Sequence, residues 1–340
     1  MNKTALALML AAALPAAHAQ TSLKLTGSVD VSLESLNKDA NEGEKGDLHV
    51  SDGVWGGSKV KIEGKEQISE ALSGIFKLEM AVNADNGAQA NEDRFFSQSW
   101  VGLEGGFGAV RFGRQDTALQ LALDSLGDMT EGSWYYNGDG LAGFIQTRNN
   151  MISYETPELG GFVLYASYAA GEAEAAAGAA TAADLNKQND LYSVSARGEI
   201  GPFAIGLGYQ SNDGAGIENI KSTDELGVAL GLNFERFGVG VGAVQSQQKH
   251  QNGLPSIKNK GYSASTRFQV SDAGTVYLSY RREDPAGENN LENGIGLSYA
   301  HGLSKRTYLY GSVGIGKIET AAGQDDLKPR RVALGVRHFF

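Results

Sequence analysis

The sequence predicts an all-β fold, namely a 16-stranded antiparallel transmembrane β-barrel. Three observations lead to this prediction. The chain begins with an export signal, and tight turns alternate with long polar loops farther on. Between them, apolar and polar residues alternate over segments of about ten residues, the length that a tilted strand needs to cross a bilayer. A soluble β-sandwich also alternates, but it does not need segments of this length or this pattern of loops.

The first nineteen residues have the features of a signal peptide. Lys3 supplies a positive charge, residues 4–14 form a short apolar run, and Ala17-His18-Ala19 is a cleavage site of the A-x-A type. The run is too short to span a membrane. We therefore expect a signal peptide at 1–19 and a barrel domain at 20–340, in a protein that leaves the cytoplasm.

The composition supports many strands joined by turns and excludes several other classes. Glycine accounts for 46 of 340 residues and proline for only 6. A mean hydropathy of −0.27 is too low for a bundle of membrane helices. The net charge of −11 argues against nucleic acid as a partner. The absence of cysteine excludes disulfides, thiolate metal sites and a cysteine nucleophile.

Alternation identifies each strand in turn. In the first, Leu23, Leu25 and Val29 share one face, while Lys24 and Thr26 lie on the other. Sixteen segments in all follow this pattern. The expected strands are 22–34, 54–66, 73–84, 93–104, 108–114, 147–155, 161–170, 189–200, 203–211, 224–235, 237–247, 261–270, 275–284, 291–301, 306–318 and 330–340.

The connections between these strands are of two kinds. Tight turns occur at 105–107, 160–161, 201–202 and 271–274, whereas long polar stretches occupy 35–52, 115–147, 171–188, 212–223, 248–260 and 319–329. Short turns on one side and long loops on the other are typical of transmembrane barrels. Lipid cannot satisfy an open sheet edge, so the sheet must close. Sixteen strands leave a water-filled lumen.

Several motifs, in matching order and spacing, resemble one known family. They are 23–30 (LKLTGSVD), 58–64 (SKVKIEG), 100–103 (WVGL), 107–115 (FGAVRFGRQ), 150–162 (NMISYETPELGGF) and 335–340 (GVRHFF). Over the whole mature chain, the sequence resembles the general trimeric porins of Gram-negative bacteria, in their betaproteobacterial form.

This resemblance implies a channel in the outer membrane for passive diffusion of small hydrophilic solutes and ions, with a weak anion preference. It also implies a homotrimer, a third loop folded into the pore, and no cofactor or enzymatic activity. The expected partners are outer-membrane lipid and lipopolysaccharide, the barrel-assembly machinery and the permeating solutes.

The resemblance places the functional site where the third loop narrows the pore. Residues 115–147 form the longest stretch without strand pattern, and 118–123 could form a short helix on the inner wall. Basic residues on the barrel wall facing acids on the loop would create a transverse field. The basic candidates are Lys59, Lys61, Lys77, Arg94, Arg111, Arg114 and Arg148, and the acidic ones are Asp116, Asp124, Asp128 and Glu131.

Two positions depart from the family pattern. Ser97 and Thr147 stand where the family has arginine, with Arg94 and Arg148 nearby. A one-residue offset reverses the side-chain face in a regular strand, which counts against Arg148 as a pore residue. At the other end of the chain, Phe340 resembles the terminal signal that the outer-membrane assembly machinery reads.

Other functions remain open at this level. They are a secreted ligand-binding sandwich, a barrel acting mainly as an adhesin or anchor, and a substrate-specific porin. Catalytic motifs are absent from the sequence, and the glycines of 238–242 lie in an alternating strand with no helix after them. Aspartate-rich loops could hold a divalent cation, but no spacing is diagnostic.

Overall fold

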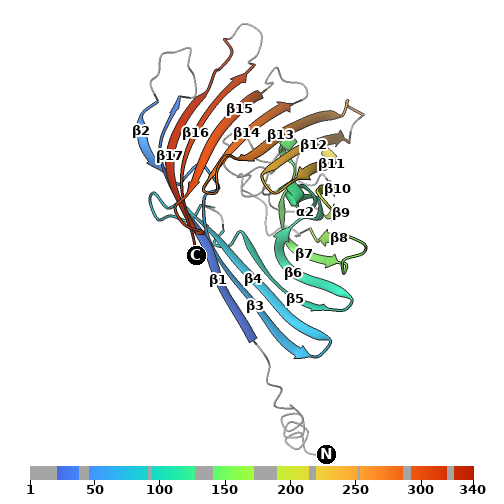
Figure 1. Cartoon of the computed structure of the whole chain (residues 1–340). Coiled ribbons are helices and arrows are strands. Elements are labelled where there is room, and N and C mark those ends of the chain that lie inside the picture. Colours follow the sequence, from blue (N-terminus) through green and yellow to red (C-terminus); the bar gives the residue numbers. More distant parts are fainter. Residues whose placement is uncertain are drawn as a thin grey trace, which may run out of the picture.

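Hydrogen-bonded strands make up most of the described chain in this computed structural model (Figure 1). The structure describes residues 21–37, 46–90, 94–126, 141–171, 190–213, 220–251, 253–285, 292–319 and 325–340. The expected signal peptide at 1–19 lies outside these residues. Within them, all strand pairs are antiparallel and belong to one sheet.

The elements follow one another around the barrel in chain order. The strands are β1 (Thr21–Asn37), β2 (Leu48–Ser51), β3 (Ser58–Ser69), β4 (Leu72–Val82), β5 (Gln98–Gly105), β6 (Gly108–Asp116), β7 (Thr147–Glu155), β8 (Phe162–Ala169), β9 (Leu191–Ile200), β10 (Phe203–Asp213), β11 (Ile220–Asn233), β12 (Phe237–His250), β13 (Ile257–Gln269), β14 (Gly274–Asp284), β15 (Glu292–Gly302), β16 (Thr307–Ile318) and β17 (Arg330–Phe339). Three short helical pieces lie between β6 and β7, namely α2 (Ala118–Leu123), η1 (Asp124–Leu126) and η2 (Leu141–Gly143).

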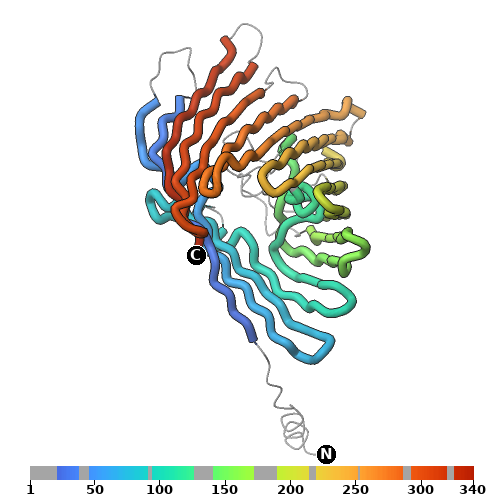
Figure 2. Tube along the Cα trace, viewed as in Figure 1, coloured from blue at the N-terminus to red at the C-terminus, as the bar shows by residue number. Residues whose placement is uncertain are grey.

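The barrel closes where the first strand meets the last. β1 pairs with β17 from Ser28 to Asn37 and with β3 from Thr21 to Ser28. Figure 2 shows the blue N-terminal strand beside the red C-terminal one. Phe340 extends this seam, because its backbone N–H donates to the Gly27 carbonyl and its carbonyl accepts from the Gly27 N–H, each at 3.1 Å. The ring therefore has no open edge at this point.

The seventeen strands of the described residues correspond to the sixteen crossings that the sequence predicts. β2 and β3 are two parts of one crossing: β2 pairs with β1 at Ser32–Ser35, and β3 pairs with the earlier half of β1. Our expected second strand, 54–66, was wrong at its start, since residues 52–57 leave the wall. Gly53 and Gly57 have positive φ angles, which break the strand. β5 also begins late, at Gln98.

The two faces of the wall differ as the alternation predicts. Apolar residues of one parity point outward and are exposed, for example Leu23, Val101 and Leu207. Residues of the other parity are small or polar and point inward, for example Ser193 and Ser279. An outward apolar face suits lipid, and an inward polar face suits water. No helix among the described residues is long and apolar enough to cross a membrane.

Both described ends of the long 115–147 segment lie on the inner face (Figure 1). The expected helix forms as α2, with Thr117 as N-cap: its Oγ1 accepts a hydrogen bond from the Gln120 N–H at 3.2 Å. Leu119 and Leu123 are buried in one cluster with Ala229 and Val244 of the wall. The helix contacts β9, β10 and β11 and can approach them closely because the wall beneath is glycine at 206, 208 and 227.

Gly206 should tolerate no side chain. A Cβ there would lie 1.9 Å from the Ala122 carbonyl oxygen, so α2 would have to move. We expect Gly206→Ala to destabilise the folded barrel by about 1–3 kcal/mol, the usual cost of overpacking. The readout is the temperature at which the barrel loses its compact gel mobility. Gly106→Ala is the control, because nothing lies within 4 Å of its Cβ. Equal melting of the two variants would contradict the close packing of α2.

Candidate functional site

Three of the expected basic residues form a cluster on the inner face of β3 and β4. Lys61 lies opposite Glu79 in the strand register, and Lys77 lies on the same face. Their Nζ atoms are 3.4 Å and 3.0 Å from Glu79 Oε2. Lys59 interacts electrostatically with Lys61, Lys77 and Glu79. Glu63 lies on the same face, opposite Lys77, so three lysines and two glutamates leave this part of the wall with a small positive excess.

Sequence reasoning missed two other charged residues that interact with this lysine cluster. Glu79 shares the parity of Lys77, so it could have been placed on the inner face from the alternation alone. Arg337 appeared only as part of the terminal motif, although its parity is opposite to the outward residues of β17. It interacts electrostatically with Lys59 and is 4% exposed.

Arg111 also faces inward, farther along the same wall. Its guanidinium is 2.5 Å from Glu155 Oε2 and lies over the Trp100 ring, 5.2 Å from the ring centroid. The carboxylate and the ring hold this cation in place on the rigid strands β5–β7.

Arg148 lies inside the barrel, contrary to our expectation from its offset. The register passes from Gly113–Met151 to Gln115–Arg148, so β7 carries an extra residue at this point. Asn150 takes a positive φ of 52° there. Because β7 is irregular, Arg148 and Met151 both face inward. Arg148 is buried, donates from Nη2 to Asn212 Oδ1 at 2.6 Å, and interacts electrostatically with Glu225.

Arg114 and Arg94 lie outside β3 and β4, the strands that carry the lysine cluster. Arg114 shares the outward parity of Phe112. Its guanidinium donates to the Ser97 carbonyl at 3.0 Å, to Asn149 Oδ1 at 2.7 Å and to Thr147 Oγ1 at 2.7 Å. Arg94 lies in the connection between β4 and β5 and not on a strand.

Two of the four candidate acids are among the described residues. Asp116 Oδ2 accepts from Gln98 Nε2 at 2.7 Å. Asp124 is exposed at the end of α2, and its Oδ1 accepts from Gln120 Nε2 at 2.8 Å. β10, on which α2 packs, lies almost half-way round the ring from β3. Asp124 therefore lies on the opposite side of the ring from the lysine cluster. Asp128 and Glu131 lie outside the described residues.

Two wall glutamates hold the returning end of the loop, and sequence reasoning missed both. Glu225 Oε2 accepts from Gln210 Nε2 at 2.5 Å and from the Ile145 N–H at 3.5 Å. Glu283 Oε2 accepts from the Ala142 N–H at 2.8 Å. Both residues have inward parity, but nothing in the sequence distinguishes them from other inward acids.

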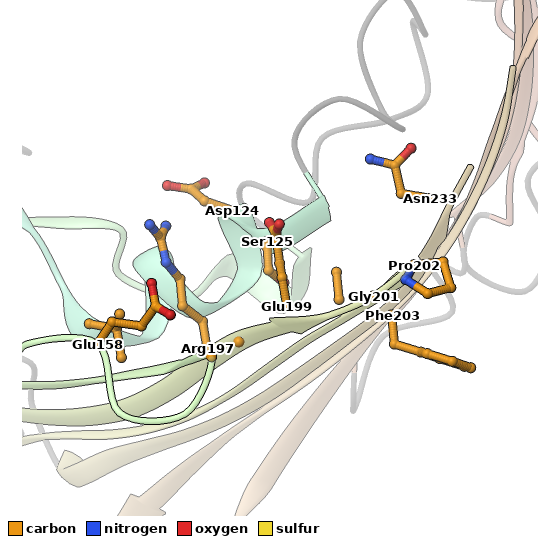
Figure 3. Close-up of a pocket in the computed structure, with 13 residues that line it drawn as sticks. Asp124, Ser125, Glu158, Arg197, Glu199, Gly201, Pro202, Phe203 and Asn233 are labelled. Atoms are coloured by element: carbon orange, nitrogen blue, oxygen red, sulfur yellow. The ribbon is translucent and has the colours of Figure 1, made fainter. Parts of the chain in front are cut away.

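A cavity of about 580 Å³ opens between α2–η1 and the nearby ends of β8–β11. Figure 3 shows the Arg197 guanidinium pointing toward Asp124, with Glu158 beside it. Arg197 also lies over the Tyr165 ring, 5.6 Å from its centroid. The lining is polar and of mixed charge, which suits water and ions better than an apolar ligand. Within the described part of the chain, no group of three or more His, Asp or Glu residues could hold a metal ion.

Comparison with known proteins gives consistent relatives. The family model described as "Gram-negative porin" matches residues 4–320. Outer membrane porin protein 32 of Delftia acidovorans is 30% identical, over 95% of this chain and 91% of that protein. An outer membrane porin protein of Bordetella pertussis is 26% identical over the full length of both.

Solved structures share the fold. The anion-selective porin from Comamonas acidovorans superposes with a TM-score of 0.73 at 24% identity, covering 94% of this chain and 100% of that one. A trimer form of OmpT from Vibrio cholerae gives a TM-score of 0.68 at 16% identity, covering 94% and 99%.

Cysteine substitution can test directly whether the lysine cluster points into the lumen, because the chain has no native cysteine. In reconstituted vesicles, Lys61→Cys should react with a charged, water-soluble thiol reagent at least roughly tenfold faster than Ile62→Cys, since the reacting thiolate forms in water and not in lipid. The measurement is the labelling rate by mass spectrometry. Similar rates at the two positions would contradict the assignment of inner and outer faces.

Proposed function

Because the chain belongs to the Gram-negative porin family, a family of outer-membrane channels rather than enzymes, we propose that its lumen carries a transverse field and weakly prefers anions. The protein is a multi-pass β-barrel of the outer membrane of a Gram-negative bacterium and passes small hydrophilic solutes and ions by diffusion.

The observation that carries the proposal is the placement of charge on opposite sides of the lumen. Lys59, Lys61 and Lys77 lie on β3–β4, with Arg111 farther along the wall. Asp124 lies across from them on the segment that covers β9–β11. Fixed charges of opposite sign on facing walls orient dipolar solutes as they pass. In this proposal the loop acids Asp128 and Glu131 add to the acidic side.

The proposed anion preference follows from which charges are near the narrow region. Charges act mainly within a Debye length, about 8–10 Å at physiological salt. The net charge of −11 therefore matters less than the local excess of three lysines over Glu63 and Glu79. The porin from Comamonas acidovorans, which shares this fold, is anion-selective and supports the same direction.

Further parts of the proposal concern export and assembly. Residues 1–19 would be removed as a signal peptide, and Phe340 would be read by the barrel-assembly machinery. The mature barrel would form a homotrimer in contact with lipid and lipopolysaccharide. The exposed apolar face of β1, with Leu25, Val29 and Leu33, supports a contact between protomers there, and OmpT has been solved in a trimer form.

Replacing Lys59 and Lys61 together with Gln tests the field. We expect the reversal potential in a tenfold KCl gradient to shift toward cations, because two fixed positive charges leave the lumen wall. The control is the double change Lys305→Gln and Arg306→Gln in the exposed turn between β15 and β16, which removes the same charge elsewhere. A reversal potential equal to wild type in the Lys59/Lys61 variant would move the selectivity site away from β3.

Deleting Phe340 tests assembly. Its backbone pairs with Gly27 across the seam, and a Cβ on Gly27 would lie 2.6 Å from its ring. We expect secretion to stay intact while the amount of folded barrel in the outer membrane falls severalfold. Phe203→Ala, an exposed aromatic at the start of β10, is the control. Normal levels of folded barrel after the deletion would rule out the assembly role.

A further inference from the structure

Residues 52–57, here called the inner segment, leave the barrel wall and lie inside it. Trp55 packs edge-on against Tyr277, Tyr308 and Tyr310, with centroid distances of 6.2, 5.5 and 5.2 Å. These tyrosines lie on the inward face of β14 and β16, because they share the register of inward residues such as Ser298 and Arg337. Trp55 itself is only 7% exposed.

Asp30 of β1 anchors the inner segment. Its Oδ2 accepts from the backbone N–H groups of Trp55 at 3.2 Å and Gly56 at 3.0 Å. Its Oδ1 accepts from the Tyr310 hydroxyl at 2.8 Å, and that hydroxyl oxygen accepts from the Val54 N–H at 3.1 Å. A carboxylate with 0% exposure requires such partners, and these hydrogen bonds hold the inner segment in one conformation.

The inner segment also fixes Arg337. The guanidinium lies 5.7 Å from the Trp55 ring centroid and 4.5 Å from that of Phe339. A Cβ on Gly56 would come within 2.8 Å of Arg337 Nη1, so the segment touches the cation closely. Arg337 interacts electrostatically with Lys59 and also with the Asp30 carboxylate, so its position affects the charge balance beside the lysine cluster.

The inner segment faces α2 across the lumen. It packs on β1, β14, β16 and β17, whereas α2 packs on β9, β10 and β11. β10 lies half-way round the ring from β1. Because chain is added to both walls, the open cross-section of the lumen is smaller than it would be with only one of the two additions.

We propose that the inner segment is a second wall of the constriction, opposite the third loop. In this proposal Trp55 is a positioning residue that holds Arg337 near the lysine cluster, where its charge favours anions. This inference rests on the proposed function and extends it, since it names residues that set pore width and selectivity and that do not belong to the third loop. If Trp55 served packing alone, replacing it would lower the stability of the barrel without changing its conductance or ion selectivity.

The test compares Trp55→Ala, Trp55→Phe and Arg337→Gln in planar bilayers. The measurements are single-channel conductance, the largest polyethylene glycol that enters the pore, and the reversal potential in a KCl gradient. We expect Trp55→Ala to raise conductance and the polymer limit and to shift the reversal potential toward cations. Arg337→Gln should shift only the reversal potential, and Trp55→Phe should stay near wild type. Phe107→Ala, an exposed aromatic in a turn, is the control.

Gly56→Ala keeps the tryptophan and guards against misfolding of the Trp55 variants. Its Cβ displaces the Arg337 guanidinium, so the reversal potential should shift even though the ring packing remains. The inference is overturned if Trp55→Ala and Gly56→Ala match wild type in all three pore measurements, even where their thermal stability falls. That result would leave the proposed channel function standing. Failure of the wild-type protein to pass any solute would instead overturn the proposed function.

Discussion

The whole structure depends on the need to pair every backbone group at the membrane-facing wall. Lipid offers no hydrogen-bond partner, so a spanning sheet must have no free edge. The seam between β1 and β17 meets this need from Ser28 to Asn37, and the Phe340–Gly27 pair continues it. Closure then separates an outside that must be apolar from an inside that can hold charge, water and extra chain.

The inside is where this protein departs from a plain cylinder. α2 approaches the wall because glycine lies beneath it, and the wall acids Glu225 and Glu283 hold the returning chain. The inner segment reaches the opposite wall through Asp30 and an aromatic cluster. The wall beneath α2 has glycine at close-contact positions, which leaves room for the helix, whereas the inner segment packs on the large inward tyrosines of β14 and β16. The functional charges are thereby fixed by packing and hydrogen bonds.

The strands could be predicted from the sequence because alternation is a direct consequence of two-faced burial. The short helix 118–123 and the inward face of Lys59, Lys61 and Arg111 followed from the same logic or from the family resemblance. Local departures from regular strand geometry could not be predicted in this way. The bulge in β7 reverses the face of Arg148, and its signal is one residue of register. Trp55 beside a strand looks like a strand residue, since only distant tyrosines and Asp30 make an inside position favourable.

The contact between Asp30 and Tyr310 joins residues that are 280 positions apart in the chain. Contacts of such sequence separation form late, because the intervening chain must first be ordered. Trp55 finds its tyrosines only once β14 and β16 are present. The aromatic packing of the inner segment therefore requires the C-terminal strands, whereas its hydrogen bonds to Asp30 join residues only 25 and 26 positions apart. The C-terminal strands thus complete the inner surface as well as the wall, because they bring the tyrosines and Arg337 to Trp55.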